Sequence, residues 1–245
     1  MNNPSTEFQT VNDDSVKAEA DRIQTVYRKR SLSHHYSWFD PSYAFMIQQR
    51  NQVLLKLLDQ HAVSKHFNDF NLLDIGCGTG AWLRTFIEWG LRPENAFGIE
   101  LLQERVDIAK CLCPNQVDIQ QGNARNLPFA DQTFDMVLQA TVFTSILDEN
   151  IQLEIAKEML RIMKPGGVIL WYDFFRNNPR NPDVRGVTKN RIHSLFPHQQ
   201  ISLTRTTLAP PITRFVVPKT WLGGVFLETM PFLRTHYLGI IRNIT

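Results

Sequence analysis

Hydrophobic positions along the chain follow two alternating patterns. Five short apolar runs predict strands, at residues 71–75, 95–100, 117–120, 134–140 and 168–173. Three segments between them carry apolar residues at helical spacing, at 81–89, 102–112 and 150–163. Strands that alternate with helices in this way predict parallel βαβ units and an α/β fold built on an open sheet.

The N-terminal region departs from this alternation. Residues 1–16 are polar and acidic, and we predict that they are disordered. Residues 17–65 are predicted to form a helical cover ahead of the first strand. Two helices, near 16–30 and 43–61, account for most of this cover, and a loop joins them.

The C-terminal region also differs from a simple βα repeat. Residues 200–208 and 236–242 predict two further strands, which would form an antiparallel edge on the sheet. Residues 210–234 between them predict an inserted amphipathic helix bounded by prolines. Residues 66–245 together are predicted to form one domain that contains this insertion.

Composition narrows the class of protein. Hydrophobic residues make up 43% of the chain and charged residues 20%, as in ordinary globular proteins, and a net charge of +2 does not indicate nucleic-acid binding. No secretory signal or membrane-spanning run is visible, so we expect a cytoplasmic protein. The three cysteines lack disulfide or zinc spacing, and we expect no metal site: Cys77, Cys111 and Cys113.

A glycine-rich turn, Asp74-Ile75-Gly76-Cys77-Gly78-Thr79-Gly80, joins the first strand to a helix. Its glycines allow the backbone to turn sharply and to approach a ligand at the helix N-terminus. The turn can be counted as a dinucleotide fingerprint, as a G-x-G-x-G cofactor turn or as an ordinary tight turn. Asp74 would repel a pyrophosphate, whereas it suits S-adenosylmethionine, which carries an ammonium and a sulfonium and no phosphate.

Two later strand ends supply further candidate ligands of a nucleoside. Glu100 ends the second strand, where a carboxylate can accept hydrogen bonds from both ribose hydroxyls. Asn123 follows the third strand, and its side chain could bond the adenine amino group while the backbone of Ala124 bonds a ring nitrogen. We therefore expect these residues to meet the glycine turn at one edge of the sheet.

Together these motifs resemble the class I S-adenosylmethionine-dependent methyltransferases. The resemblance covers about residues 70–175 and also rests on Gly98-Ile99-Glu100, Leu127-Pro128-Phe129, Phe134-Asp135-Met136-Val137 and Leu160 to Gly167. It implies a Rossmann-like seven-stranded sheet of order 3-2-1-4-5-7-6, with strand 7 antiparallel. Many members carry Asp where this chain has Asn123. The cofactor contacts that it implies are Asp74, Gly76, Cys77, Gly78, Gly80, Glu100, Leu101, Asn123, Ala124 and Gln139.

The acceptor half of the site is less defined by sequence. Candidate catalytic residues are His35 and Tyr36, in the loop of the helical cover, and Asp173, at the end of the fifth strand. Further candidates follow strands four and five: Gln139, Thr141, Phe143, Thr144, Arg176 and Asn177. Gln139-Ala140-Thr141-Val142 stands where base-amino methyltransferases carry Asn/Asp-Pro-Pro-aromatic, which argues against that kind of DNA methylation.

We predict methyl transfer to an oxygen or nitrogen of a small apolar or anionic molecule, in natural-product or glycan tailoring. The aromatic insertion at 210–234 would act as a lid over this acceptor or as a dimer contact. A stretch rich in arginine and lysine, residues 176–219, leaves open an RNA or protein methyltransferase that binds its substrate there. A module that binds S-adenosylmethionine without turnover is the third alternative.

Overall fold

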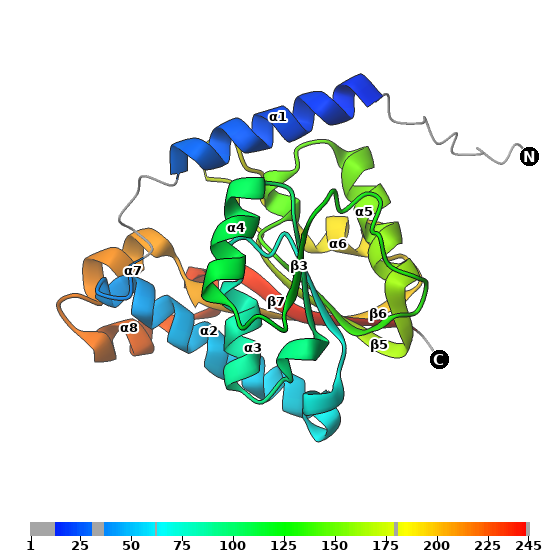
Figure 1. Cartoon of the computed structure of the whole chain (residues 1–245). Helices are drawn as coiled ribbons and strands as arrows, with labels where there is room; N and C mark the ends of the chain where they lie inside the picture. Colours follow the sequence, from blue (N-terminus) through cyan, green and yellow to red (C-terminus); the bar gives the residue numbers. More distant parts are fainter. Residues whose placement is uncertain (1–12, 31–36, 62, 179–180, 244–245) are drawn as a thin grey trace, which may run out of the picture.

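The computed structural model describes residues 13–30, 37–61, 63–178 and 181–243. A seven-stranded sheet of order β3-β2-β1-β4-β5-β7-β6 forms its centre (Figure 1). Only β7 runs antiparallel to its neighbours. The predicted order and the antiparallel strand are therefore confirmed. The strands are β1 (Leu72–Ile75), β2 (Ala96–Glu100), β3 (Asp118–Gln121), β4 (Phe134–Ala140), β5 (Met163–Phe174), β6 (Gln199–Leu208) and β7 (Arg234–Asn243).

Helices cover both faces of the sheet. One face packs against α2 (Pro41–Gln60), α3 (Ala81–Glu88) and α4 (Gln103–Leu112). The other face packs against α5 (Glu149–Ile162) and α6 (Lys189–Leu195). The central strands are apolar on both sides because both of their faces are covered, and all four residues of β1 are buried.

The two N-terminal helices differ in their role. α2 begins at Pro41, and Asp40 caps it by accepting a hydrogen bond from the Ser42 N–H at 2.8 Å. α1 spans Asp13–Arg30, so it begins within the segment predicted to be disordered, and residues 1–12 lie outside the described part of the chain. α1 lies across the top of the molecule, as viewed in Figure 1.

Two local features differ from the sequence predictions. The β5 strand already begins at Met163, and its pairing with β4 shifts between Met163 and Val168, so the proline and glycines form an irregularity within the strand. The inserted segment contains two short helices, α7 (Pro210–Val216) and α8 (Trp221–Glu228), rather than the predicted single helix. Pro218 separates them because proline lacks the N–H of a continuing helix.

The direction of β6 determines where the inserted helices lie. β7 is antiparallel to both β5 and β6, so β6 runs parallel to β5. The connection from β6 to β7 therefore leaves the sheet at the edge where β1 to β5 have their carboxyl ends. Ligands of open α/β sheets bind at this edge. The insertion consequently lies at the ligand-binding edge of the fold.

Candidate cofactor and active site

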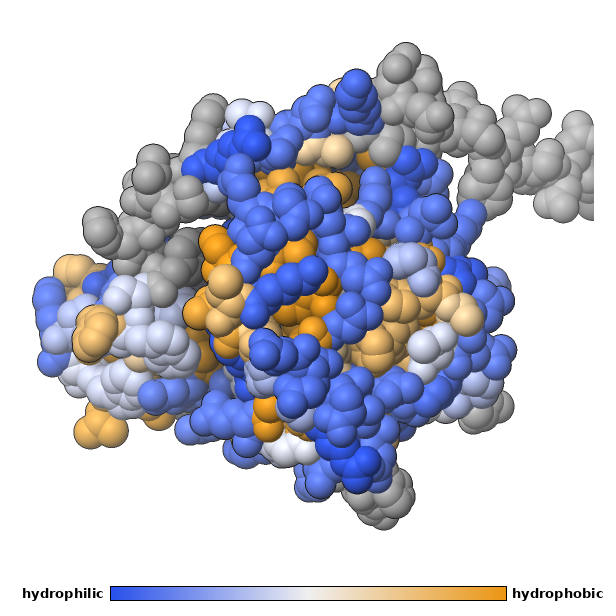
Figure 2. All heavy atoms as spheres, in the orientation of Figure 1, coloured by the Kyte–Doolittle hydropathy of each residue, from blue (hydrophilic) through white to orange (hydrophobic). Residues whose placement is uncertain are grey.

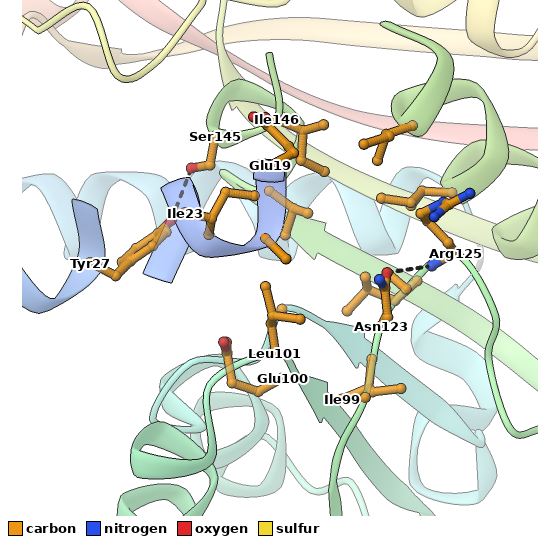
Figure 3. A pocket seen from close by; sticks show the side chains of 18 of the residues that line it. Glu19, Ile23, Tyr27, Ile99, Glu100, Leu101, Asn123, Arg125, Ser145 and Ile146 are labelled. Carbon is orange, nitrogen blue, oxygen red and sulfur yellow. Dashed lines mark hydrogen bonds between the residues drawn. The ribbon is translucent and has the colours of Figure 1, made fainter. Parts of the chain in front are cut away.

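A cavity of about 450 Å³ opens at the carboxyl ends of β1, β2 and β4. It is large enough for a cofactor-sized molecule. Figure 3 shows Glu100 and Leu101 on one side of it and residues of α1 on the other. Its walls combine strand ends, α1, α4, α5 and the loops after β3 and β4: Glu19, Ala20, Ile23, Tyr27, Ile75, Gly76, Ile99, Glu100, Leu101, Arg105, Gly122, Asn123, Ala124, Arg125, Ala140, Thr141, Val142, Ser145, Ile146, Ile151 and Ile155.

Glu100 is held in position by two backbone donors. Its Oε2 accepts a hydrogen bond from the Gly78 N–H at 2.9 Å, and its Oε1 accepts one from the Leu102 N–H at 3.1 Å. The side chain is only 7% exposed, yet it lines the cavity. Each carboxylate oxygen keeps a further lone pair. The carboxylate is therefore oriented in advance to accept hydrogen bonds from two neighbouring hydroxyls.

The glycine turn has a left-handed backbone, with φ of 66° at Gly76, 58° at Gly78 and 75° at Gly80. The three positions differ in what a side chain would meet. A Cβ would lie 2.6 Å from Val142 at Gly76 and 2.5 Å from Cys113 at Gly80, whereas the nearest atom at Gly78 is an arginine nitrogen 3.4 Å away. Packing within the protein therefore requires glycine at positions 76 and 80. At Gly78 no protein atom lies closer than 3.4 Å to the added Cβ, so this position leaves the most room for a ligand.

Asp74 and Cys77 lie beneath this turn rather than on the cavity wall. Asp74 is 1% exposed, and its Oδ2 has no hydrogen-bond partner among the described residues. Burial, reinforced by the nearby Glu100 carboxylate, raises the Asp74 pKa well above its usual value. Burial also raises the pKa of the Cys77 thiol, whose side chain belongs to the core on the α2–α4 face. The Cys77 side chain is therefore part of the core and does not line the cavity.

Asn123, Ala124 and Leu101 lie on the cavity wall, as the resemblance implies. Asn123 Oδ1 accepts a hydrogen bond from the Arg125 N–H at 3.1 Å, which Figure 3 shows as a dashed line. This bond closes a small side-chain turn and directs the amide. The oxygen keeps a second lone pair and the Asn123 nitrogen remains a donor, so the side chain can still bond a ring edge.

The α1 helix covers the cavity, and its contribution is not evident from the sequence. Glu19 accepts a hydrogen bond from the Leu147 N–H at 2.6 Å. Arg22 donates to the Ser145 backbone oxygen at 2.6 Å, and the Tyr27 and Ser145 hydroxyls are 2.9 Å apart. These bonds tie α1 to the loop after β4, and Figure 3 shows the one between Tyr27 and Ser145 as a dashed line. Helical spacing predicted α1, but only tertiary packing brings its side chains into the site.

Arg105 is a second residue that sequence reasoning missed. It lies in the first turn of α4 and lines the cavity. Its guanidinium carbon is 4.4 Å from the centroid of the Tyr27 ring, which places it in cation–π contact with α1. A cation on the same cavity wall as the Glu100 carboxylate suits a ligand with charges of both signs, such as an amino acid group. Arg105 lies five residues after Glu100 in the sequence, and this position alone did not indicate a role in the site.

The loop after β4 supplies the remaining polar wall. Thr141 has φ of 60°, which a β-branched residue rarely adopts. Its N–H donates to the Tyr172 oxygen at 2.8 Å, and its own oxygen accepts from the hydroxyls of Thr144 and Ser145. These bonds hold the strained backbone. Thr141 and Ser145 therefore present backbone and hydroxyl groups at the cavity, as predicted for Thr141 from its place after the strand.

Gln139 and Asp173 are buried together behind this loop and are not among the cavity-lining residues. Both are 0% exposed, and the Thr144 hydroxyl donates to Asp173 Oδ1 at 2.6 Å. Burial raises the Asp173 pKa to about 7, against hydrogen bonds from Thr144 and Gln139 that lower it. Gln139 Oε1 accepts the Val142 N–H at 3.3 Å. The geometry places both residues in support of the loop rather than in contact with a ligand.

Other predicted acceptor residues lie outside the cavity wall. Phe143 is buried in the core, Asn177 accepts the Gly186 N–H, and Arg176 donates to the Phe232 oxygen. His35 and Tyr36 lie outside the described residues. In the part of the chain that the structure describes, residues 210–234 contribute nothing to the cavity wall. The insertion therefore does not close over this cavity, and α1 takes that place.

The basic stretch is not one continuous cationic face. Arg185 and Arg191 approach the carboxylate of Glu149 at 3.6 and 3.5 Å. Arg205 lies over the ring of Phe175, with its guanidinium carbon 5.3 Å from the centroid. These three cations lie on the loop before α6, on α6 and on β6, and each has a partner within the chain. The predicted alternative of an RNA-binding face gains no specific support from this arrangement.

The residues present fit S-adenosylmethionine rather than a pyrophosphate cofactor. The unpaired Asp74 Oδ2 is a buried acceptor beneath the turn, and the Glu100 carboxylate stands where ribose hydroxyls are expected. Gly78 keeps its open side clear. The Glu100 carboxylate at the cavity wall would oppose a diphosphate, whereas it attracts an ammonium or a sulfonium. Glu100, Asn123 and Ala124 would hold the nucleoside, whereas Asp74 is enclosed beneath the turn and does not line the cavity.

Comparisons with known proteins agree with this geometry. A family profile described as "Methyltransferase domain" matches residues 73–171. A demethylmenaquinone methyltransferase of Bacillus cereus is 26% identical over 159 residues, covering 63% of this chain and 62% of that protein. Norajmaline N-methyltransferase of Rauvolfia serpentina is 27% identical over 156 residues, covering 59% and 51%. The chain thus spans less than two thirds of the length of these relatives.

Solved structures share the fold at low sequence identity. A SAM-dependent methyltransferase from Methanosarcina mazei has a TM-score of 0.54 at 17% identity, covering 73% of this chain and 94% of that one. Another, from Thermotoga maritima, has a TM-score of 0.53 at 19% identity, covering 79% and 86%. The sheet order, the glycine turn and the matched segment lead to one conclusion: the chain has the fold of the class I S-adenosylmethionine-dependent methyltransferases, and its residues 73–171 are similar to a methyltransferase domain.

Proposed function

We propose that this chain transfers a methyl group from S-adenosylmethionine to an oxygen or nitrogen of a small, largely apolar molecule. The observation that carries the proposal is the single cavity wall on which Glu100, the glycine turn and Asn123 meet, closed on its far side by α1. The names of two relatives, a demethylmenaquinone and a norajmaline methyltransferase, support a small-molecule acceptor. Natural-product tailoring is the setting that we favour for it.

Bound S-adenosylmethionine supplies an electrophilic methyl group, which an acceptor lone pair attacks in line while the carbon–sulfur bond breaks. The residues of this chain contribute alignment and exclusion of water. Ile23 and Ile146 present apolar surface to the cavity, and α1 restricts access from solvent. The hydroxyls of Tyr27 and Ser145 lie 2.9 Å apart on the same wall and can orient a polar acceptor group.

The proton of the acceptor must leave during the reaction. An amine can lose it to water before attack, so no protein base is needed for nitrogen. Asp173 is a positioning residue in this proposal, because its carboxylate is buried behind Thr144 and reaches the cavity only through the loop. His35 and Tyr36 remain predicted bases for an oxygen acceptor.

Transfer of labelled methyl groups tests the proposal. The chain is incubated with methyl-labelled S-adenosylmethionine and a panel of amines, phenols and quinols, and labelled product is identified by mass spectrometry. We expect label in a small molecule, and loss of that label in Glu100→Ala. Label in RNA or protein instead would overturn the acceptor class. Tight cofactor binding without transfer to any acceptor, including cell extract, would overturn the activity and favour a binding module.

A further inference from the structure

The inserted helices carry a cluster of apolar side chains that face solvent. Six of the eleven exposed large hydrophobic residues in the described chain lie between residues 215 and 232, so their exposure is concentrated in one segment. In Figure 2 the α7 and α8 end of the molecule shows a few orange side chains among paler residues. We call this cluster the insertion face, and its members are Phe215, Trp221, Leu222, Val225, Phe226 and Phe232.

The insertion face is held rigidly outward by an inner side that is already packed. A Cβ at Gly224 would lie 3.1 Å from the ring of Phe45, so α8 lies close against α2. Glu228, one turn further on, accepts the Thr207 N–H at 3.2 Å and is 7% exposed. By contrast, Leu222 and Phe226 are 78% and 62% exposed on the opposite side of α8. Trp221 also packs edge-on against Phe45, with 5.0 Å between the ring centroids, whereas Leu222 and Phe226 are additional to the core that anchors the helices.

The charges around the insertion face are of one sign. Arg214 and Lys219 are exposed, and the Lys219 ammonium lies 3.8 Å from the centroid of the Phe215 ring. Glu228 is the only carboxylate in residues 209–234, and its side chain is buried. Within residues 209–234, the outward surface therefore combines aromatic and aliphatic side chains with cations and has no exposed carboxylate. It is complementary to an apolar phase with anionic groups at its boundary.

We propose that the insertion face docks on the surface of an anionic lipid bilayer. Short helices with aromatic and aliphatic residues on one side and basic residues beside them lie within the headgroup region and do not cross the membrane. α7 has 7 residues and α8 has 8, and no helix in the described residues is long and apolar enough to span a bilayer. A symmetric second copy would instead place the Arg214 and Lys219 charges of both chains together.

Docking in this way would orient the active site. The insertion leaves the sheet at the same edge as the cofactor cavity, because β6 runs parallel to β5. Arg176, just after β5, donates to the Phe232 backbone oxygen at 3.4 Å and so joins the insertion to the carboxyl end of β5. If the chain transfers methyl groups as proposed above, its acceptor would then be a molecule that partitions into the bilayer, and this step rests on that proposed function. Docking itself does not depend on methyl transfer.

Vesicle flotation tests the docking. The full chain is mixed with vesicles of phosphatidylcholine alone, or of equal parts phosphatidylcholine and phosphatidylglycerol, and bound protein is quantified after centrifugation. We expect binding to the anionic vesicles, weakened at least about tenfold in Leu222→Ser/Phe226→Ser and in Arg214→Glu/Lys219→Glu. Ile108→Ser/Leu112→Ser is the matched control, since it removes two exposed apolar residues from α4 and should bind normally.

Three results would overturn this inference. The first is absence of wild-type binding to anionic vesicles, and the second is an equal loss in the α4 control. The third is a dimer in sedimentation that Leu222→Ser/Phe226→Ser dissociates, without vesicle binding, which would make the face a subunit contact. Cofactor affinity and thermal unfolding of each variant, measured without vesicles, establish that the site and the fold are intact. They also separate failure of docking from failure of the proposed activity.

Discussion

Replacing Asp173 by asparagine should remove a pH-dependent loss of stability. Asp173 is fully buried, and burial raises its pKa to about 7 although the Thr144 hydroxyl bonds its carboxylate. In the unfolded chain the carboxyl regains its ordinary pKa of 3.8. Between these values the native protein holds a proton that the unfolded chain has released. The free energy of unfolding therefore falls as the pH rises. The stability that the native protein gains by keeping Asp173 protonated is fully present at low pH and is lost as the pH rises through the native pKa.

The size of the effect follows from the two pKa values. Each pH unit between them lowers the free energy of unfolding by about 1.4 kcal/mol. Raising the pH from about 5 to about 8 should therefore cost the wild type roughly 2.5 kcal/mol through this carboxyl. Asp173→Asn keeps the side-chain shape and an acceptor for the Thr144 hydroxyl, but it cannot ionise. Its free energy of unfolding should therefore lack the fall that the Asp173 carboxyl causes between these two pH values.

Urea unfolding followed by tryptophan fluorescence measures this difference at both pH values. Trp171, buried two residues before Asp173, provides a probe near the site. Glu88→Gln, which neutralises an exposed carboxylate on α3, is the control and should follow the wild type. The contributions of other buried carboxyls, such as Asp74, to the pH dependence cancel when variants are compared, because every variant contains them. If wild type and Asp173→Asn lose stability in parallel between the two pH values, the assigned titration is wrong.

Three further predictions address the cofactor site. Glu100→Ala should weaken S-adenosylmethionine binding in calorimetry by at least about tenfold, because it removes charge-assisted hydrogen bonds, and an unchanged affinity would refute the ribose assignment. Gly80→Ala should lower the free energy of unfolding in urea by about 2 kcal/mol or more, since its Cβ would lie 2.5 Å from the Cys113 sulfur. The control Gly166→Ala, also at a positive φ of 77°, meets no atom within 4 Å and should lower it by only about 1 kcal/mol. Equal losses in the two variants would contradict the packing argument. Tyr27→Phe should raise the cofactor dissociation rate in stopped-flow by roughly two- to tenfold, and an unchanged rate would show that α1 does not retain the ligand.

Local pattern was sufficient for most of the architecture. Apolar runs separated by helical spacing identified the strands of the sheet, because buried parallel strands need apolar side chains on both faces. The order of the strands came from the family resemblance, and the structure confirms it. Asp74, Glu100 and Asn123 could be singled out because each stands at a strand end, where an open α/β sheet binds its ligand.

Local pattern was insufficient where contacts join distant parts of the chain. The sequence identified α1 as a helix, but Glu19 and Tyr27 reach the cavity only through bonds to residues more than a hundred positions away. Asp173 looked like a candidate base at a strand end, and only the packing of the loop after β4 shows that its carboxylate is enclosed. Which way a polar side chain faces depends on its neighbours in space.

The insertion illustrates the same division. Its prolines and aromatic residues indicated a helical segment between the last two strands, and its position at the ligand-binding edge follows from strand direction. Whether its apolar side chains turn toward the cavity or toward solvent was decided by the close contact of Gly224 with Phe45, which anchors one side of α8 and leaves Phe226 outside. Sequence by itself predicted the strands, the helices and candidate cofactor contacts at the strand ends, because these follow from local spacing and position along the chain. Only the tertiary structure decided which surface closes the cavity and which faces outward, because these depend on the packing of segments far apart in the chain.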